Sequence, residues 1–122
     1  MPDVVYLVRD MLFSSKIREV ATQLGLEARK LDLSGADPAA LTRAAAGARV
    51  AIIDLRLDGA LAALDTLAAD PSLAALTRVG FVDHEKVEVM DAARAHGCSR
   101  VLTKGQFAKE LPGLLSAARA GD

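Results

Sequence analysis

Hydrophobic residues gather in five short runs along the chain, and amphipathic segments separate these runs. Four runs are continuous and rich in β-branched residues, as is typical of strands buried on both faces of a parallel sheet. The fifth run alternates imperfectly among charged residues, which suits a strand at the edge of a sheet. The pattern therefore predicts strands at residues 4–8, 26–33, 50–53, 79–82 and 101–102.

The segments between the runs have the period of helices. In the first, apolar side chains recur at residues 13, 17, 20, 21 and 24, and Gly25 ends the helix. Asp37 and Pro38 form an N-cap with proline at the first helical position, so they begin a helix over residues 39–46. Two more helices are predicted at residues 61–68 and 87–93. Because proline disrupts a helix interior, we expect the last helix to start near Lys109, with Pro112 in its first turn.

Strand and helix alternate strictly, which predicts a single α/β domain over residues 1–122. Crossover helices of this length imply a parallel sheet with helices on both faces, a three-layer sandwich. Five strands favour the flavodoxin-like order 2-1-3-4-5. An eight-stranded barrel would need about twice this length of chain.

Charge and cysteine content narrow the class of function. Fifteen basic and 16 acidic residues leave a net charge of −1, without the basic excess that nucleic acid or an anionic membrane attracts. The single cysteine, Cys98, cannot form an intrachain disulfide, so nothing indicates an oxidising compartment. No apolar run approaches the roughly 20 residues of a membrane span, and residues 4–8 lack a preceding basic segment, so we expect no signal peptide. We therefore expect a cytoplasmic domain with no nucleic-acid or membrane partner.

Charged residues follow four of the predicted strands. Arg9 and Asp10 follow the first strand, Asp54 the third, Asp83 the fourth and Lys104 the fifth. Ligands of open α/β sheets bind beyond the carboxyl ends of the strands, where these five side chains, here called the rim residues, should meet. A purely structural explanation also exists, because charged residues are needed wherever a buried strand reaches the surface.

Two segments resemble the receiver domains of response regulators. Residues 50–55, Val-Ala-Ile-Ile-Asp-Leu, followed by Asp58 and Gly59, are similar to the phosphoacceptor strand of that family. Residues 96–104, which end in Val-Leu-Thr-Lys, resemble the segment that carries the family's lysine. The resemblance implies that Asp54 accepts a phosphoryl group, that Lys104 contacts it, and that Asp10 and Asp54 hold Mg²⁺. It also implies a signalling protein or kinase as partner.

The departures from the family weaken this chemistry. Arg9 stands where the family has a carboxylate, and a guanidinium cannot ligate Mg²⁺, so we expect Arg9 to pair with Asp54 or Asp10 instead. Asp83 replaces a hydroxyl residue and would repel a phosphoryl group by about 4 kcal/mol at ~4 Å and an effective dielectric constant of about 20. We expect Asp83 to share Lys104 with Asp54. Val101 replaces the aromatic switch residue, and Gly105 replaces proline.

These departures predict a degenerate receiver, or pseudo-receiver. We expect a stand-alone, non-enzymatic module that acts through protein–protein interaction and needs no cofactor, with Mg²⁺ only weakly supported. One alternative is a working receiver phosphorylated on Asp54 by a histidine kinase. Another is a small cofactor-binding protein or enzyme on a flavodoxin-like fold, although residues 9–16 lack the glycine that a phosphate-binding loop needs.

The resemblance also predicts a partner or homodimer surface on the fourth helix, the fifth strand and the fifth helix. Its residues are Val87, Val89, Met90, Val101 and Gly105. Gly105 is expected in a turn, where glycine restricts the backbone less than the family's proline does. The three apolar residues of the helix span more than one face, so at least one should be partly exposed. The competing interpretation buries Val87 and Met90 in the core and leaves Val89 as an ordinary exposed residue.

Overall fold

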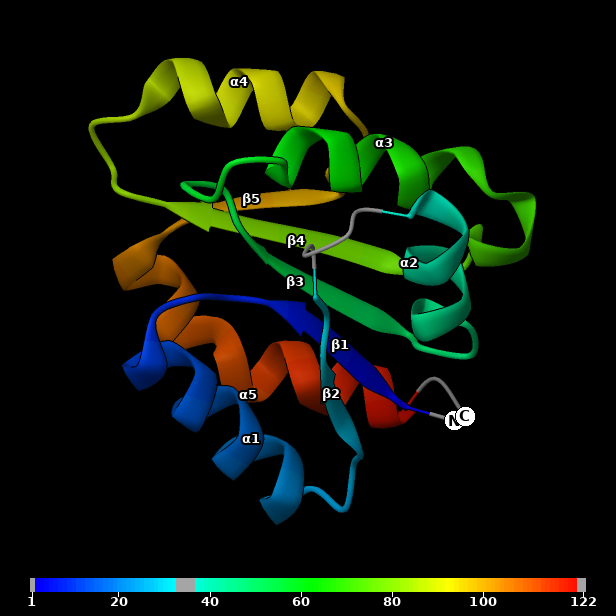
Figure 1. Cartoon of the computed structure of the whole chain (residues 1–122). Coiled ribbons are helices and arrows are strands. Elements are labelled where there is room, and N and C mark those ends of the chain that lie inside the picture. Colours follow the sequence, from blue (N-terminus) through cyan, green and yellow to red (C-terminus); the bar gives the residue numbers. More distant parts are fainter. Residues whose placement is uncertain (1, 33–36, 121–122) are drawn as a thin grey trace.

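A five-stranded parallel sheet forms the centre of the structure, a computed structural model that describes residues 2–32 and 37–120 (Figure 1). The strand order is β2-β1-β3-β4-β5, which confirms the predicted topology. Residue 33, the last residue of the predicted edge strand at 26–33, lies outside the described residues. The strands are β1 (Val4–Leu7), β2 (Ala28–Lys30), β3 (Val50–Asp54), β4 (Thr77–Val82) and β5 (Arg100–Thr103).

Helices cover both faces of this sheet, as Figure 1 shows. On one face lie α1 (Met11–Gln23) and α5 (Lys104–Ala120). On the other lie α2 (Pro38–Ala45), α3 (Ala60–Ala69) and α4 (Val87–Ala95), and a short 3₁₀ turn, η1 (Pro71–Leu73), precedes β4. None of the helices in the described part of the chain is both long and apolar enough to cross a membrane.

The two faces of the sheet have separate hydrophobic cores. Side chains alternate along β1, so Val4 and Tyr6 face α1 and α5 while Val5 and Leu7 face α2, α3 and α4. In the core between the sheet and helices α1 and α5, the rings of Phe81 and Phe107 stack with centroids 4.4 Å apart. Burial on both faces explains why the strand runs in the sequence are continuous rather than alternating.

Local capping explains where α1 and α2 begin. The Asp37 carboxylate accepts a hydrogen bond from the backbone nitrogen of Ala39 at 3.0 Å, which confirms the predicted N-cap of α2. Asp10 does the same for α1, accepting from Leu12 at 2.9 Å and Phe13 at 3.3 Å. The helix consequently starts before the first apolar residue of the pattern, Phe13.

The predicted start of the last helix near Lys109 is wrong. α5 begins at Lys104 and contains Pro112 in its interior. A capping box explains the early start: Thr103 Oγ1 accepts from the Gln106 nitrogen at 3.2 Å, and Gln106 Oε1 accepts from the Thr103 nitrogen at 2.9 Å. Burial of Phe107 before the proline and of Leu111 beside it offsets the hydrogen bond that Pro112 cannot donate.

Replacing Pro112 by alanine should raise the free energy of unfolding by about 1–3 kcal/mol, because it restores the missing donor inside α5. Chemical denaturation measures the change. As a matched control, Gly113→Ala adds a Cβ with no heavy atom within 4 Å and should raise stability by about 0.5–1 kcal/mol. If the Pro112→Ala variant were no more stable than the wild type, Pro112 would not interrupt the interior of α5 and would instead belong to the first turn of a helix that starts near Lys109.

Candidate functional site

The buried carboxylate of Asp54 is the centre of the candidate site. Asp54 is the last residue of β3, and only 1% of its surface is exposed. Arg56, two residues further on, engages both carboxylate oxygens: Nε lies 3.3 Å from Oδ1, and a terminal guanidinium nitrogen lies 3.2 Å from Oδ2. The backbone nitrogen of Arg56 also donates to Oδ1 at 3.1 Å. The carboxylate is therefore held by three hydrogen bonds from one neighbouring residue.

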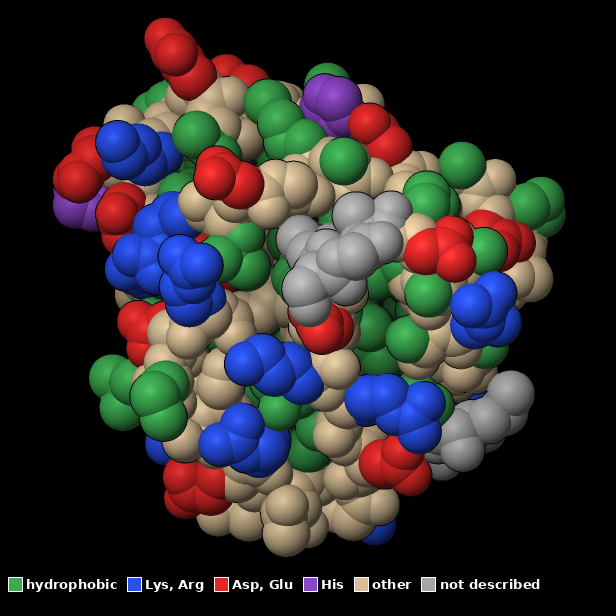
Figure 2. All heavy atoms as spheres, in the orientation of Figure 1, with side chains coloured by type: hydrophobic (Ala, Val, Ile, Leu, Met, Phe, Trp, Pro, Cys, Tyr) green, Lys and Arg blue, Asp and Glu red, His purple; other side chains and the backbone are tan. Residues whose placement is uncertain are grey.

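The guanidinium of Arg56 lies within the electrostatic reach of three acidic residues. Its hydrogen bond to Asp54 is the main cause that raises its pKa, and the charges of Asp54, Asp83 and Asp10 raise it further, while partial burial opposes them. Arg56 thus remains a permanent cation at the carboxyl ends of the strands. Figure 2 shows Lys and Arg side chains clustered on the side of the molecule where β1 and β3 end in Figure 1.

The expected pairing of Arg9 with Asp54 or Asp10 is wrong. Arg9 is exposed, and within the described residues it forms no ion pair. Arg56 pairs with Asp54 instead, because both residues belong to one tight turn in which the Leu57 nitrogen donates to the Asp54 carbonyl at 3.2 Å. A pair two residues apart requires little extra ordering of the chain. Sequence analysis did not single out Arg56, although its spacing from Asp54 was visible.

Lys104 and Asp83 form the second ion pair of the rim. Lys104 Nζ lies 3.1 Å from Asp83 Oδ1, and among the described residues Lys104 has no ion pair with Asp54, so the expected sharing of Lys104 is wrong. The hydrogen bond to Lys104 is the main cause that lowers the pKa of Asp83 below its ordinary value of 3.8. The pair therefore stabilises the folded domain fully above pH 3.8, and this stabilisation is lost as the pH falls through the lowered pKa of Asp83.

The rim residues do not fit a Mg²⁺ ion. Mg²⁺ needs an octahedral set of oxygen ligands, and the resemblance assigned it to Asp10 and Asp54. Oδ1 of Asp10 caps α1, and both oxygens of Asp54 bind Arg56. The described residues contain no group of three His, Cys, Asp or Glu side chains placed to hold a metal. The guanidinium of Arg56 supplies the positive charge that a metal would otherwise bring to Asp54.

The residues predicted for the partner surface differ in how far they are exposed. Val87 is 59% exposed, whereas Val89 and Met90 are half-buried and pack against the core with Ala93. The interpretation that buries Val87 and exposes Val89 is therefore wrong, because the buried stripe of α4 starts two residues after Val87. Val101 is half-buried as well.

Gly105 lies in the first turn of α5 and has open space around it, so its expected place in a free turn is also wrong. Sequence analysis also missed Met11 and Leu12 at the start of α1, which are 81% and 77% exposed, more than any other large hydrophobic residue in the described part of the chain.

Other polar candidates have structural roles. Ser14 is buried and donates to the Val8 carbonyl at 3.1 Å, so it holds the β1–α1 loop rather than a phosphate. Cys98 is buried in the core, where burial raises the pKa of its thiol. His96 ends α4 and lies 2.7 Å from Asp65, while His84 is exposed beside Glu85.

The chain is similar in fold to solved receiver domains of response regulators. A response regulator from Hahella chejuensis superposes with a TM-score of 0.74 at 16% identity, covering 97% of this chain and 95% of that one. The receiver domain of NtrX from Brucella abortus gives 0.72 at 22% identity, covering 95% and 97%. The chemotaxis response regulator CheY4 of Vibrio cholerae gives 0.71 at 16% identity, covering 97% and 98%.

At this level of identity the likeness establishes the receiver fold of the chain. The sequence matches no protein-family model and no curated protein.

Replacing Arg56 by leucine should lower the free energy of unfolding by about 1–3 kcal/mol, because it leaves the buried Asp54 carboxylate without its cation. Arg9→Leu, the matched control, should change stability by less than about 0.5 kcal/mol. Adding Asp54→Asn to Arg56→Leu should recover part of the loss, since no unpaired charge then remains. Chemical denaturation at neutral pH measures all three, and equal losses for Arg9→Leu and Arg56→Leu would contradict the assignment.

Proposed function

We propose that this chain is a receiver-like signalling module that acts by binding a partner protein, without conventional Mg²⁺-dependent phosphorylation of Asp54. The receiver fold supports the signalling class. The bidentate contact of Arg56 with the buried Asp54 carboxylate is the observation that carries the rest. In this proposal the module is not an enzyme and works in the cytoplasm, and its partner is a signalling protein, such as a kinase, or a second copy of the chain.

The chemistry of phosphoryl transfer explains why this contact matters. A carboxylate oxygen can attack phosphorus only when it is free to approach in line with the leaving group, and metal or cationic groups must neutralise the transferred phosphoryl oxygens. Both oxygens of Asp54 already accept hydrogen bonds, and the negative charge of Asp83 lies at the same edge of the sheet. Both features raise the barrier to phosphorylation.

The switch of a working receiver also lacks two of its parts in this chain. Asp83 cannot donate the hydrogen bond that a hydroxyl gives to a phosphoryl oxygen, and Val101 has no ring to change rotamer. We therefore propose one conformation of the binding surface rather than two that phosphorylation exchanges.

A working receiver phosphorylated on Asp54 by a histidine kinase is the second candidate. The placement of Asp54 at the end of β3, of Lys104 directly after β5 and of Asp10 after β1 supports it, because these strand ends lie at one edge of the sheet.

Incubation of the wild type with acetyl phosphate and Mg²⁺ should leave Asp54 essentially unmodified, because Arg56 occupies the carboxylate. Intact-mass spectrometry detects the mass of one added phosphoryl group. The variant Arg9→Asp, Arg56→Ser, Asp83→Thr should gain the acyl phosphate, since it frees Asp54, adds a carboxylate for Mg²⁺ and restores a hydroxyl.

The same variant with Asp54→Asn controls for modification at another residue. Stoichiometric acyl phosphate on wild-type Asp54 would overturn the proposal in favour of the working receiver.

Val87→Glu should reduce partner binding or self-association by about tenfold or more, because a charge at the centre of an apolar contact is desolvated on binding. Sedimentation at several concentrations measures self-association. Quantitative mass spectrometry of proteins retained on the immobilised domain measures partner binding. Circular dichroism confirms that the variant is folded.

Leu12→Glu and Lys16→Glu on α1 are the matched controls for this surface. Both should leave binding unchanged if α4 is the contact face. Loss of binding with Leu12→Glu alone would move the surface to the exposed start of α1 and contradict its assignment to Val87.

A further inference from the structure

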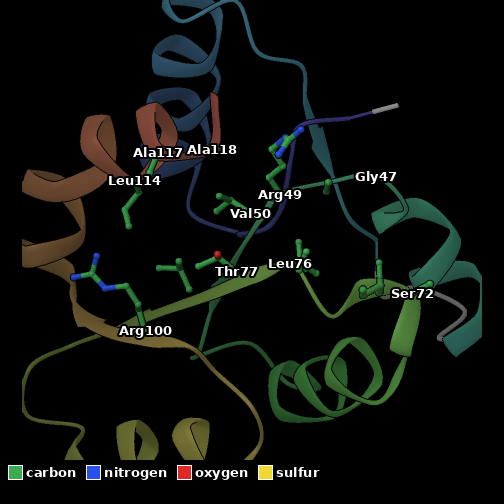
Figure 3. Close-up of a pocket in the computed structure, with 14 residues that line it drawn as sticks. Gly47, Arg49, Val50, Ser72, Leu76, Thr77, Arg100, Leu114, Ala117 and Ala118 are labelled. Carbon is green, nitrogen blue, oxygen red and sulfur yellow. The ribbon is translucent and has the colours of Figure 1, made fainter. Parts of the chain in front are cut away.

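A pocket lies at the amino-terminal ends of β3, β4 and β5, opposite the rim. Its volume is about 480 Å³, within the range of small-molecule sites. The floor is apolar and comes from Val50, Val79 and Leu114. Figure 3 shows Leu114, Ala117 and Ala118 of α5 over the strands, across from Thr77 of β4. Small alanine side chains in the last turns of α5 leave this space open.

The charged side chains that line the pocket are both arginines. Arg49 precedes β3 and Arg100 begins β5, and Figure 3 shows them on different sides of Val50 and Thr77. None of the described residues that line the pocket is acidic, while Ser72 and Thr77 contribute hydroxyl groups. Glu110 pairs with Arg100 at 2.7 Å, but it does not line the pocket. A basic mouth over an apolar floor matches the chemistry of an anion with an apolar body.

We propose that this pocket binds a small amphipathic anion, an aliphatic or aromatic carboxylate whose apolar body lies against Val50 and Leu114. Its anionic group would lie beside Arg100, at one side of the mouth. This inference does not depend on the function proposed for the rim, because the pocket is built from the other end of the strands. Binding would link α5 to the starts of β3 and β4, so the domain carries a ligand site separate from Asp54.

The probe for this site is decanoate, a ten-carbon carboxylate, titrated into the ¹⁵N-labelled full chain and followed by NMR. A ligand of this size is expected to bind with Kd on the order of 1 mM or tighter. Shifts should concentrate at the backbone amides of Thr77, Val79, Leu114 and Ala117. Decan-1-ol and decyltrimethylammonium, which have the same chain but no negative charge, should bind at least about fivefold more weakly.

Two variants separate the charge of the pocket from the ion pair on α5. Arg100→Leu should weaken decanoate binding about fivefold or more, because it removes a cation from the mouth. Glu110→Leu breaks the same ion pair but keeps Arg100, so it should leave binding unchanged or tighten it. Leucine is a good helix former, so Ala117→Leu should keep α5 intact while its larger side chain fills the pocket and weakens decanoate binding about tenfold or more.

Three results would overturn the proposal. The first is no saturable shift with decanoate, and the second is shifts confined to residues away from the pocket. The third is equal binding of decan-1-ol and decanoate, which would show an apolar crevice without selection for an anion. Decanoate binding does not involve Asp54. A chain that fails to bind decanoate would therefore overturn the pocket proposal alone, and phosphorylation of Asp54 would overturn only the function proposed above.

Discussion

The ion pair between Asp54 and Arg56 is the interaction on which the chemistry of this domain depends. Asp54 ends a strand that is buried on both faces, and a carboxylate in that position is strongly destabilising unless a cation and hydrogen bonds compensate it. Arg56 supplies both from the same turn of the chain. The carboxylate of Asp54 is thereby held in an internal contact that engages both of its oxygens.

The other contacts of the rim are weaker and have mainly structural effects. The side chains of Lys104 and Asp83 are each about one-third exposed, and solvent screens a pair of that kind, so it contributes little to stability. The cap that Asp10 provides for α1 is worth about 1 kcal/mol. Asp54, Asp83, Lys104 and Asp10 nevertheless each have an intramolecular partner, while Arg9 is exposed.

The two ends of the sheet consequently differ in character. At the carboxyl ends of the strands, acidic and basic side chains neutralise one another through short contacts. At the amino-terminal ends, a pocket lined by apolar side chains carries arginines at its mouth and no acidic residue among its described lining. The two ends of the sheet thus carry different sets of side chains: ion pairs that include Asp54 and Asp83 at one end, and an apolar pocket with arginines in its lining at the other.

The sequence by itself determined the fold. Runs buried on two faces, the strict alternation of strands with helices, and the Asp37-Pro38 cap depend on local residue pattern, and the structure has the topology they predict. The position of Asp54 after β3 was equally visible, because the carboxyl end of a strand follows from the strand itself. The Thr103–Gln106 capping box was visible too, but the proline rule was given more weight, and that choice misplaced the start of α5.

Tertiary structure alone decided which charges pair and which apolar residues are exposed. Arg9 and Arg56 are equally charged in sequence, and only the tight turn after β3 brings the second into contact with Asp54. Val87 and Val89 are identical in chemistry, and only the orientation of α4 on the sheet exposes one and half-buries the other. Whether Arg56 reaches Asp54 depends on the conformation of the turn, and which face of α4 is buried depends on how the helix packs on distant strands; the linear pattern carries no information on either.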